Sequence, residues 1–123
     1  MQPQGILLVD DSSLARLMIK DILQANSYAV VGEAENGKAA LEMYKKINPM
    51  IVIMDIIMPV MDGMEALKEI LGYNPQAKII IVSAISEREY IDKAMQLGTF
   101  DYITKPFDEM RLLAAIGKIL EKE

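Results

Sequence analysis

Residues 50–55 read MIVIMD, a run of apolar residues that ends in an aspartate. The same pattern, a short apolar run with a polar residue directly after it, occurs at residues 6–11 (ILLVDD), 79–83 (IIIVS) and 102–105 (YITK). The runs at 50–54 and 79–82 are apolar at every position, which is typical of parallel strands that are covered on both faces of a sheet. The sequence therefore predicts a buried parallel sheet in which a polar residue follows each strand.

Helical segments separate these strands. We predict helices at residues 13–25, 37–47, 63–71, 87–97 and 108–121, and a further strand at 29–34. Ser12, Asn36 and Ser86 are the predicted N-caps, and Gly72 and Gly98 are the predicted helix ends. Regular alternation of strands and helices predicts the α/β class, with helices on both faces of the sheet.

Composition narrows the range of functions. The chain has 123 residues, which suggests one domain spanning 1–123, and a formal net charge of −5 with no strongly basic patch, so we expect no direct binding of nucleic acid. It contains no cysteine and no histidine, which excludes disulfides, thiolate metal sites and imidazole catalysis. Its apolar stretches are far shorter than the roughly 20 residues that span a bilayer, so we expect no membrane partner. The absence of cysteine fits a reducing cytosol, so we expect a cytoplasmic location.

The polar residues after the strands are predicted to meet. Asp10, Asp11, Asp55, Ser83 and Lys105 all fall at the carboxyl ends of predicted parallel strands. Each of them alone is more often a turn former, a helix cap or a solvated side chain. Ligands of open α/β sheets bind outside the carboxyl ends of the strands, so the joint placement indicates a site.

The residue types at this edge indicate the chemistry. Three carboxylates held close together repel one another, and a hard divalent cation such as Mg²⁺ removes that repulsion. An aspartate can then act as a nucleophile toward a phosphoryl group and form an aspartyl phosphate. Lys105 can pair with one phosphoryl oxygen, and the Ser83 hydroxyl can donate to another.

The motifs resemble those of one known family. Asp10-Asp11, the segment MDIIMP at 54–59 leading to MDG at 61–63, Ser83 and KPF at 105–107 resemble the receiver domain of bacterial and archaeal two-component response regulators. The resemblance covers residues from about 4 to 120. It implies a doubly wound, flavodoxin-like sheet of five parallel strands in the order 2-1-3-4-5.

The resemblance also implies a role for each acidic residue. Asp55 would be the phosphorylated residue. Asp11 and Asp55 would bind one Mg²⁺ ion directly and Asp10 would bind it through water, while the backbone carbonyl of Ile57 would be a further ligand.

Further residues receive roles from the same resemblance. Ser83 and Lys105 would bind the phosphoryl group, and the bond from Lys105 to Pro106 would be cis. Tyr102 falls where the family has a switch aromatic, which rotates inward when the serine moves toward the phosphate.

Partners follow from the resemblance as well. The phosphoryl group would come from a sensor histidine kinase or a histidine phosphotransfer protein, and Ala15 and Met18 are expected to be partly exposed and to contact this donor. The surface of the fourth helix, fifth strand and fifth helix, which carries Tyr90 and Ile91, would bind a downstream target or output domain, or pair two receivers into a homodimer.

Several alternatives remain open on the sequence. The chain could be a free-standing regulator of the chemotaxis type or a receiver from a longer transcriptional regulator. Such a receiver is a signalling switch that catalyses only its own phosphorylation and dephosphorylation. The other classes are a metal-dependent phosphatase with an aspartate nucleophile, a flavodoxin-like flavin binder and a receiver that is never phosphorylated.

Overall fold

The computed structural model describes residues 5–121, so both ends of the predicted domain 1–123 lie outside the described residues. The strands are β1 Ile6–Val9, β2 Val30–Ala34, β3 Ile51–Met54, β4 Ile79–Ser83 and β5 Asp101–Thr104. The helices are α1 Ser13–Ala25, α2 Gly37–Ile47, α3 Gly63–Tyr73, α4 Arg88–Leu97 and α5 Glu109–Glu121. Strands and helices thus alternate along the described chain, as predicted.

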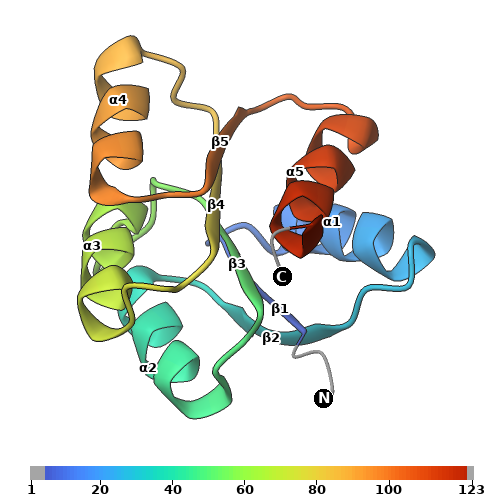
Figure 1. Ribbon diagram of the computed structural model, residues 1–123, viewed down its shortest axis with the longest axis horizontal. Helices are drawn as coiled ribbons and strands as arrows, with labels where there is room; N and C mark the ends of the chain where they lie inside the picture. The colour runs from blue at the N-terminus through green and yellow to red at the C-terminus, as the bar shows by residue number, and fades with distance from the viewer. Residues whose placement is uncertain (1–4, 122–123) are drawn as a thin grey trace.

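The strands form one sheet in the order β2-β1-β3-β4-β5, and neighbouring strands run parallel. Helices α1 and α5 cover one face of this sheet, and α2, α3 and α4 cover the other (Figure 1). The predicted doubly wound α/β fold and its strand order are confirmed.

The central strands are apolar at every position because each face of the sheet has its own core. Leu7, Val52 and Ile81 belong to the core under α2, α3 and α4. Leu8 and Ile80, one position along β1 and β4, belong to the core under α1 and α5. Successive side chains of a strand point to opposite faces, so a strand that is buried on both faces has no position for a polar residue.

Strand register brings the carboxyl ends of β1 and β3 together. Val9 pairs with Met54, so Asp10 and Asp55 are the next residues on two neighbouring strands. On the next pair of strands, Ser83 at the end of β4 pairs with Thr104 at the end of β5, and Lys105 follows directly. The predicted convergence at one sheet edge is therefore a consequence of register.

Two predicted helix boundaries are wrong. Gly72 does not end α3, which continues to Tyr73, because a glycine at an exposed helical position reduces stability without breaking the backbone hydrogen bonds. Ser86 does not cap α4: Glu87 is the N-cap, and its side chain makes no capping hydrogen bond. The carbonyl of Glu87 accepts the amides of Tyr90 and Ile91, so the first helical bonds form one residue later than predicted.

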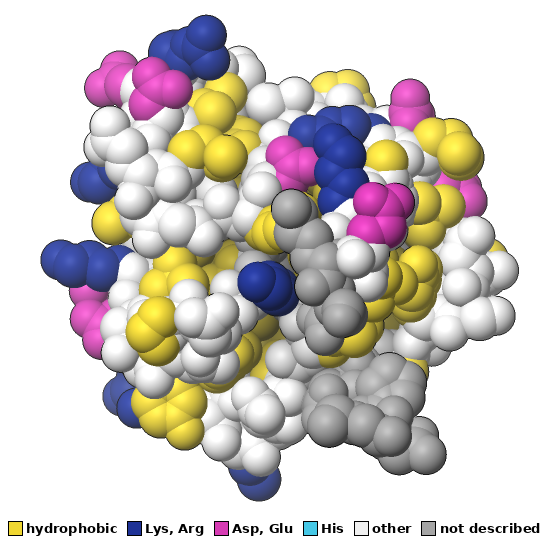
Figure 2. Space-filling view, in the orientation of Figure 1, with side chains coloured by type: hydrophobic (Ala, Val, Ile, Leu, Met, Phe, Trp, Pro, Cys, Tyr) yellow, Lys and Arg dark blue, Asp and Glu magenta, His cyan; other side chains and the backbone are white. Residues whose placement is uncertain are grey.

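Smaller differences concern single residues at the ends of elements. Asp108 precedes α5, and its carboxylate accepts the Arg111 amide at 2.9 Å, as an N-cap does. The peptide bond between Lys105 and Pro106 is cis, as expected. Among residues 5–121, no helix combines the length and apolar character needed to cross a membrane. On the face seen in Figure 2, side chains of both charges are scattered among apolar ones.

The start of α3 packs directly on the backbone after β3. The Gly63 amide donates to the Ile56 carbonyl at 2.7 Å, and a Cβ atom at position 63 would lie 1.9 Å from the Asp55 carbonyl oxygen. Only a residue without a side chain allows this approach.

We therefore expect Gly63→Ala to lower the free energy of unfolding by about 3 kcal/mol, because backbone atoms must move to admit the methyl group. Gly72→Ala is the matched control: nothing lies within 4 Å of its added Cβ, so the higher helix propensity of alanine should raise stability by about 0.5–1 kcal/mol. Urea denaturation measures both changes. Equal effects of the two substitutions would contradict the close contact at Gly63.

Candidate functional site

Lys105 lies at the centre of the polar cluster at the sheet edge. Its ammonium nitrogen donates to Asp10 Oδ2 at 2.9 Å and to Asp55 Oδ2 at 3.1 Å. The three residues follow β5, β1 and β3, so the ion pairs join the carboxyl ends of three strands. The structure thus brings together three of the five residues that the strand-end pattern predicted.

Asp10 is held at several atoms and is only 4% exposed. Its amide donates to the Ala34 carbonyl at 3.0 Å, and its Oδ1 accepts the Ser12 amide at 2.9 Å. A buried carboxylate requires partners of this kind, because burial of an unpaired charge is strongly unfavourable. Asp10 is therefore held in one orientation, with its second carboxylate oxygen bonded to Lys105.

Asp55 bonds a backbone amide with one carboxylate oxygen and the Lys105 ammonium with the other. Its Oδ1 accepts the Ile56 amide at 2.6 Å, and its own amide donates to the Val9 carbonyl at 2.9 Å. The side chain is 12% exposed, so it lies between the buried Asp10 and the solvent. This places a partly accessible carboxylate oxygen beside a cation.

The environment of Lys105 keeps its ammonium charged. Burial alone would lower its pKa, but the hydrogen bond to Asp10 and the charge and hydrogen bond of Asp55 outweigh burial and raise the pKa. The cluster therefore contains a permanent positive charge at neutral pH.

Asp11 and Ile57 lie at the rim of this cluster. The Asp11 side chain is exposed, and the Ile57 side chain is 61% exposed. Within residues 5–121, no group of three or more potential ligand side chains is close enough together to hold a metal ion. Of the three predicted carboxylates, Asp10 and Asp55 meet at Lys105, whereas the exposed Asp11 does not join them in a group of three.

The oxygen atoms present nevertheless fit Mg²⁺. This ion typically binds one or two carboxylates together with several waters and phosphate oxygens. Asp10 and Asp55 supply two carboxylates of this kind, and both already bond a positive charge, the Lys105 ammonium.

Ser83 is fully buried at the end of β4. Its hydroxyl oxygen accepts the Ile85 amide at 3.2 Å, and its carbonyl accepts the Lys105 amide at 2.8 Å. Ser83 therefore links the loop after β4 to Lys105, which bonds the two carboxylates.

Tyr102 faces inward. It is 7% exposed, burial raises its pKa, and its hydroxyl donates to the Ile85 carbonyl at 2.6 Å. Ser83 and Tyr102, the two predicted switch residues, thus bind the amide and the carbonyl of the same residue.

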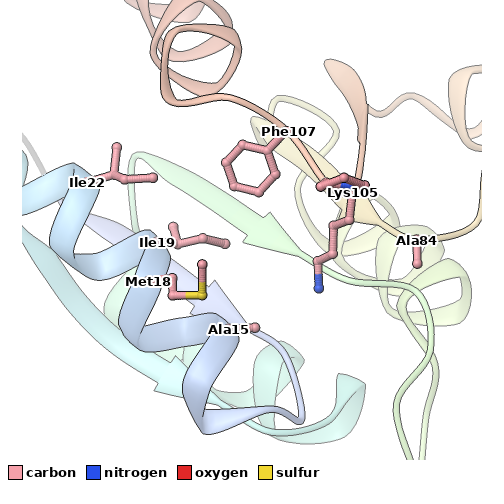
Figure 3. A pocket seen from close by; sticks show the side chains of 8 residues that line it. Ala15, Met18, Ile19, Ile22, Ala84, Lys105 and Phe107 are labelled. Carbon is pink, nitrogen blue, oxygen red and sulfur yellow. The ribbon is translucent and has the colours of Figure 1, made fainter.

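An apolar pocket of about 430 Å³ lies beside the cluster, between α1 and the segment after β5. Figure 3 shows Ala15, Met18 and Ile19 of α1 across this pocket from Phe107 and Lys105. Met18 is 60% exposed and Ala15 is partly exposed, as the sequence predicted. The lining role of Phe107 was not predicted, although the residue belongs to the KPF motif.

Comparison with known proteins identifies the class. Residues 6–117 match the response regulator receiver domain. The chain therefore belongs to the family of response regulator receiver domains, which are signalling switches of two-component systems rather than enzymes in the usual sense.

Individual relatives place the chain near the chemotaxis regulators. It is 51% identical to chemotaxis protein CheY of Bacillus subtilis, over 94% of this chain and 96% of that protein. Identity to chemotaxis protein CheY of Thermotoga maritima is 45%, over 93% of this chain and 95% of that protein. A solved CheX–CheY–BeF3–Mg²⁺ complex from Borrelia burgdorferi contains a chain with a TM-score of 0.92 and 28% identity, over 96% of this chain and 90% of that one. The chain is thus a receiver domain of the CheY type, in chemotaxis-type two-component signalling.

The raised pKa of Lys105 predicts a pH-dependent stability. Its ammonium should contribute fully below about pH 10.5, the ordinary lysine value, and this contribution should disappear as the pH rises through the higher pKa of the folded state. We expect the difference in free energy of unfolding between the wild type and Lys105→Met to shrink over this alkaline range. Urea titrations of both proteins at a series of pH values measure it. A difference that stays constant through the alkaline range would contradict the assignment.

Proposed function

We propose that this chain is a phosphorylation-controlled switch that accepts a phosphoryl group on Asp55 from a phosphohistidine of a sensor histidine kinase or a histidine phosphotransfer protein. The single observation that supports this most is the Lys105 ammonium, which lies within hydrogen-bonding distance of both Asp10 and Asp55. A nucleophilic carboxylate beside a fixed cation suits phosphoryl transfer, which depends mainly on positioning and charge stabilisation.

Asp55 supplies the attacking oxygen in this proposal. A bond forms from a carboxylate oxygen of Asp55 to phosphorus while the bond from phosphorus to the donor imidazole nitrogen breaks, and the imidazole keeps the electron pair. Oδ1 is held by the Ile56 amide, so the carboxylate is already oriented before the donor arrives. The Lys105 ammonium already donates to Asp55 Oδ2, so it can donate instead to a phosphoryl oxygen once the phosphoryl group is attached to Asp55.

Asp11 and Asp55, with Asp10 through water and the backbone carbonyl of Ile57, would hold one Mg²⁺ ion. When bound, this ion neutralises the carboxylates and the phosphoryl oxygens. Two observations support this: the Asp10 and Asp55 carboxylates lie together at Lys105, and the complex of the Borrelia burgdorferi relative contains Mg²⁺.

The switch would act through the loop after β4. The Ser83 hydroxyl can turn from the Ile85 amide toward a phosphoryl oxygen, and the Tyr102 hydroxyl bonds the Ile85 carbonyl in the same loop. A change there would reach the face of α4, β5 and α5, where Tyr90 is exposed and Ile91 is partly exposed, and this face would bind a downstream target.

Phosphorylation tests the proposal directly. We expect incubation with acetyl phosphate and Mg²⁺ to add one phosphoryl group, because Asp55 is oriented and partly accessible, and we expect Asp55→Asn or removal of Mg²⁺ to prevent it. Intact-protein mass spectrometry measures the gain. Equal labelling of the Asp55→Asn variant would refute Asp55 as the acceptor.

Donor docking is tested separately. We expect Ala15→Glu with Met18→Glu to slow transfer from a phosphorylated histidine-kinase domain about tenfold, equivalent to about 1.4 kcal/mol, because the charges would lie on the apolar pocket. Loading from acetyl phosphate needs no docking and should not change. Met95→Glu, an exposed methionine on α4, is the matched control. Docking at α1 would be contradicted if the Met95→Glu control also slowed transfer, or if the double variant transferred at the wild-type rate.

A further inference from the structure

Arg16 connects α1 with the turn that carries the acidic pair. Its Nε donates to Glu33 Oε1 at 2.8 Å, and one of its terminal nitrogens donates to the backbone carbonyl of Asp10. The side chain is only 13% exposed, although it belongs to the first turns of a helix beside the site. A guanidinium removed from water to this extent is held by specific partners.

The carbonyl that Arg16 holds belongs to the peptide group between Asp10 and Asp11. On one side of this peptide, the Asp10 amide is bonded to the Ala34 carbonyl at 3.0 Å. On the other side, the Ser12 amide is bonded to Asp10 Oδ1 at 2.9 Å. Rotation of the peptide group would change the direction of the exposed Asp11 side chain, and the guanidinium opposes that rotation.

Glu33 orients the guanidinium in turn. It lies on β2 opposite Leu8 of β1, and its second carboxylate oxygen accepts Lys20 at 3.3 Å. The hydrogen bond from Arg16 is the main cause that lowers the pKa of Glu33, so this carboxylate stays ionised and keeps its partner in place. An arginine can contact Glu33 and Asp10 at once with its planar fork, and a lysine offers one ammonium for both.

We propose that Arg16, oriented by Glu33, is a positioning residue that fixes the Asp10–Asp11 peptide so that the Asp11 carboxylate points toward the divalent cation. This inference rests on the proposed function, because it concerns the same cation. Loss of an outer partner that orients a metal ligand typically lowers metal affinity 10- to 100-fold.

The sign of the effect distinguishes positioning from simple charge. Removal of a positive charge near a cation site should strengthen cation binding by reducing repulsion. Loss of a positioning contact should weaken it. Arg16→Met therefore gives opposite results under the two explanations.

Isothermal titration calorimetry with MgCl2 at neutral pH measures the Mg²⁺ affinity of the wild type and of Arg16→Met, Arg16→Lys, Glu33→Gln and Lys20→Met. We expect Arg16→Met to bind Mg²⁺ at least about tenfold more weakly. Arg16→Lys and Glu33→Gln should show smaller losses in the same direction. Lys20→Met is the matched control, because Lys20 bonds Glu33 as Arg16 does but, within residues 5–121, makes no hydrogen bond with Asp10. The Mg²⁺ affinity of this variant should not fall.

A second readout separates affinity from chemistry. The Mg²⁺ concentration for half-maximal labelling by acetyl phosphate should rise in Arg16→Met, while labelling at saturating Mg²⁺ approaches that of the wild type. Circular dichroism during heating shows which variants are folded. If Arg16→Met does not fold, Arg16→Lys and Glu33→Gln decide the matter.

Unchanged or stronger Mg²⁺ binding in the folded Arg16 and Glu33 variants would overturn the positioning role. An equal loss in Lys20→Met would also overturn it, because the effect would then not depend on the contact with Asp10. A wild type that neither binds Mg²⁺ nor accepts a phosphoryl group would instead refute the proposed function itself.

Discussion

Two carboxylates share one ammonium at the edge of the sheet, and the rest of the site depends on this arrangement. Asp10 and Asp55 each bond Lys105, although the three residues follow three different strands. Like charges held side by side are unfavourable unless a cation lies between them. The fold can place two acidic residues after neighbouring strands because β5 brings a lysine to the same edge. In the proposed function, the same lysine would also pair with the incoming phosphoryl group.

The sheet and most of the site were predictable because they depend on short-range patterns. Fully apolar strands indicate burial on both faces, and register then brings Asp10, Asp55 and Lys105 together. Tyr102 lies inward, its role as a switch aromatic stays a prediction, and its bond to the Ile85 carbonyl could not be foreseen from sequence.

What the sequence did not reveal depends on side-chain geometry between distant segments. Arg16 and Glu33 are far apart in the chain, and either alone is typical of a solvated surface residue. The pocket position of Phe107 depends on how the segment after β5 approaches α1. The predicted cap at Ser86 failed because several polar residues near a helix start compete, and backbone conformation decides which one becomes the cap.

The close approach of Gly63 to the backbone of Asp55 makes the surroundings of Asp55 much more tightly packed toward α3 than toward α4. Toward α3 the packing leaves no room for even a methyl group, so displacement in that direction meets backbone atoms. On the side of α4, the loop after β4 is held at Ile85 by single hydrogen bonds to Ser83 and Tyr102. Helix α4 then starts without a side-chain cap, a contact typically worth about 1 kcal/mol. In the proposed switch, a displacement of Asp55 would therefore meet less resistance toward α4 than toward α3.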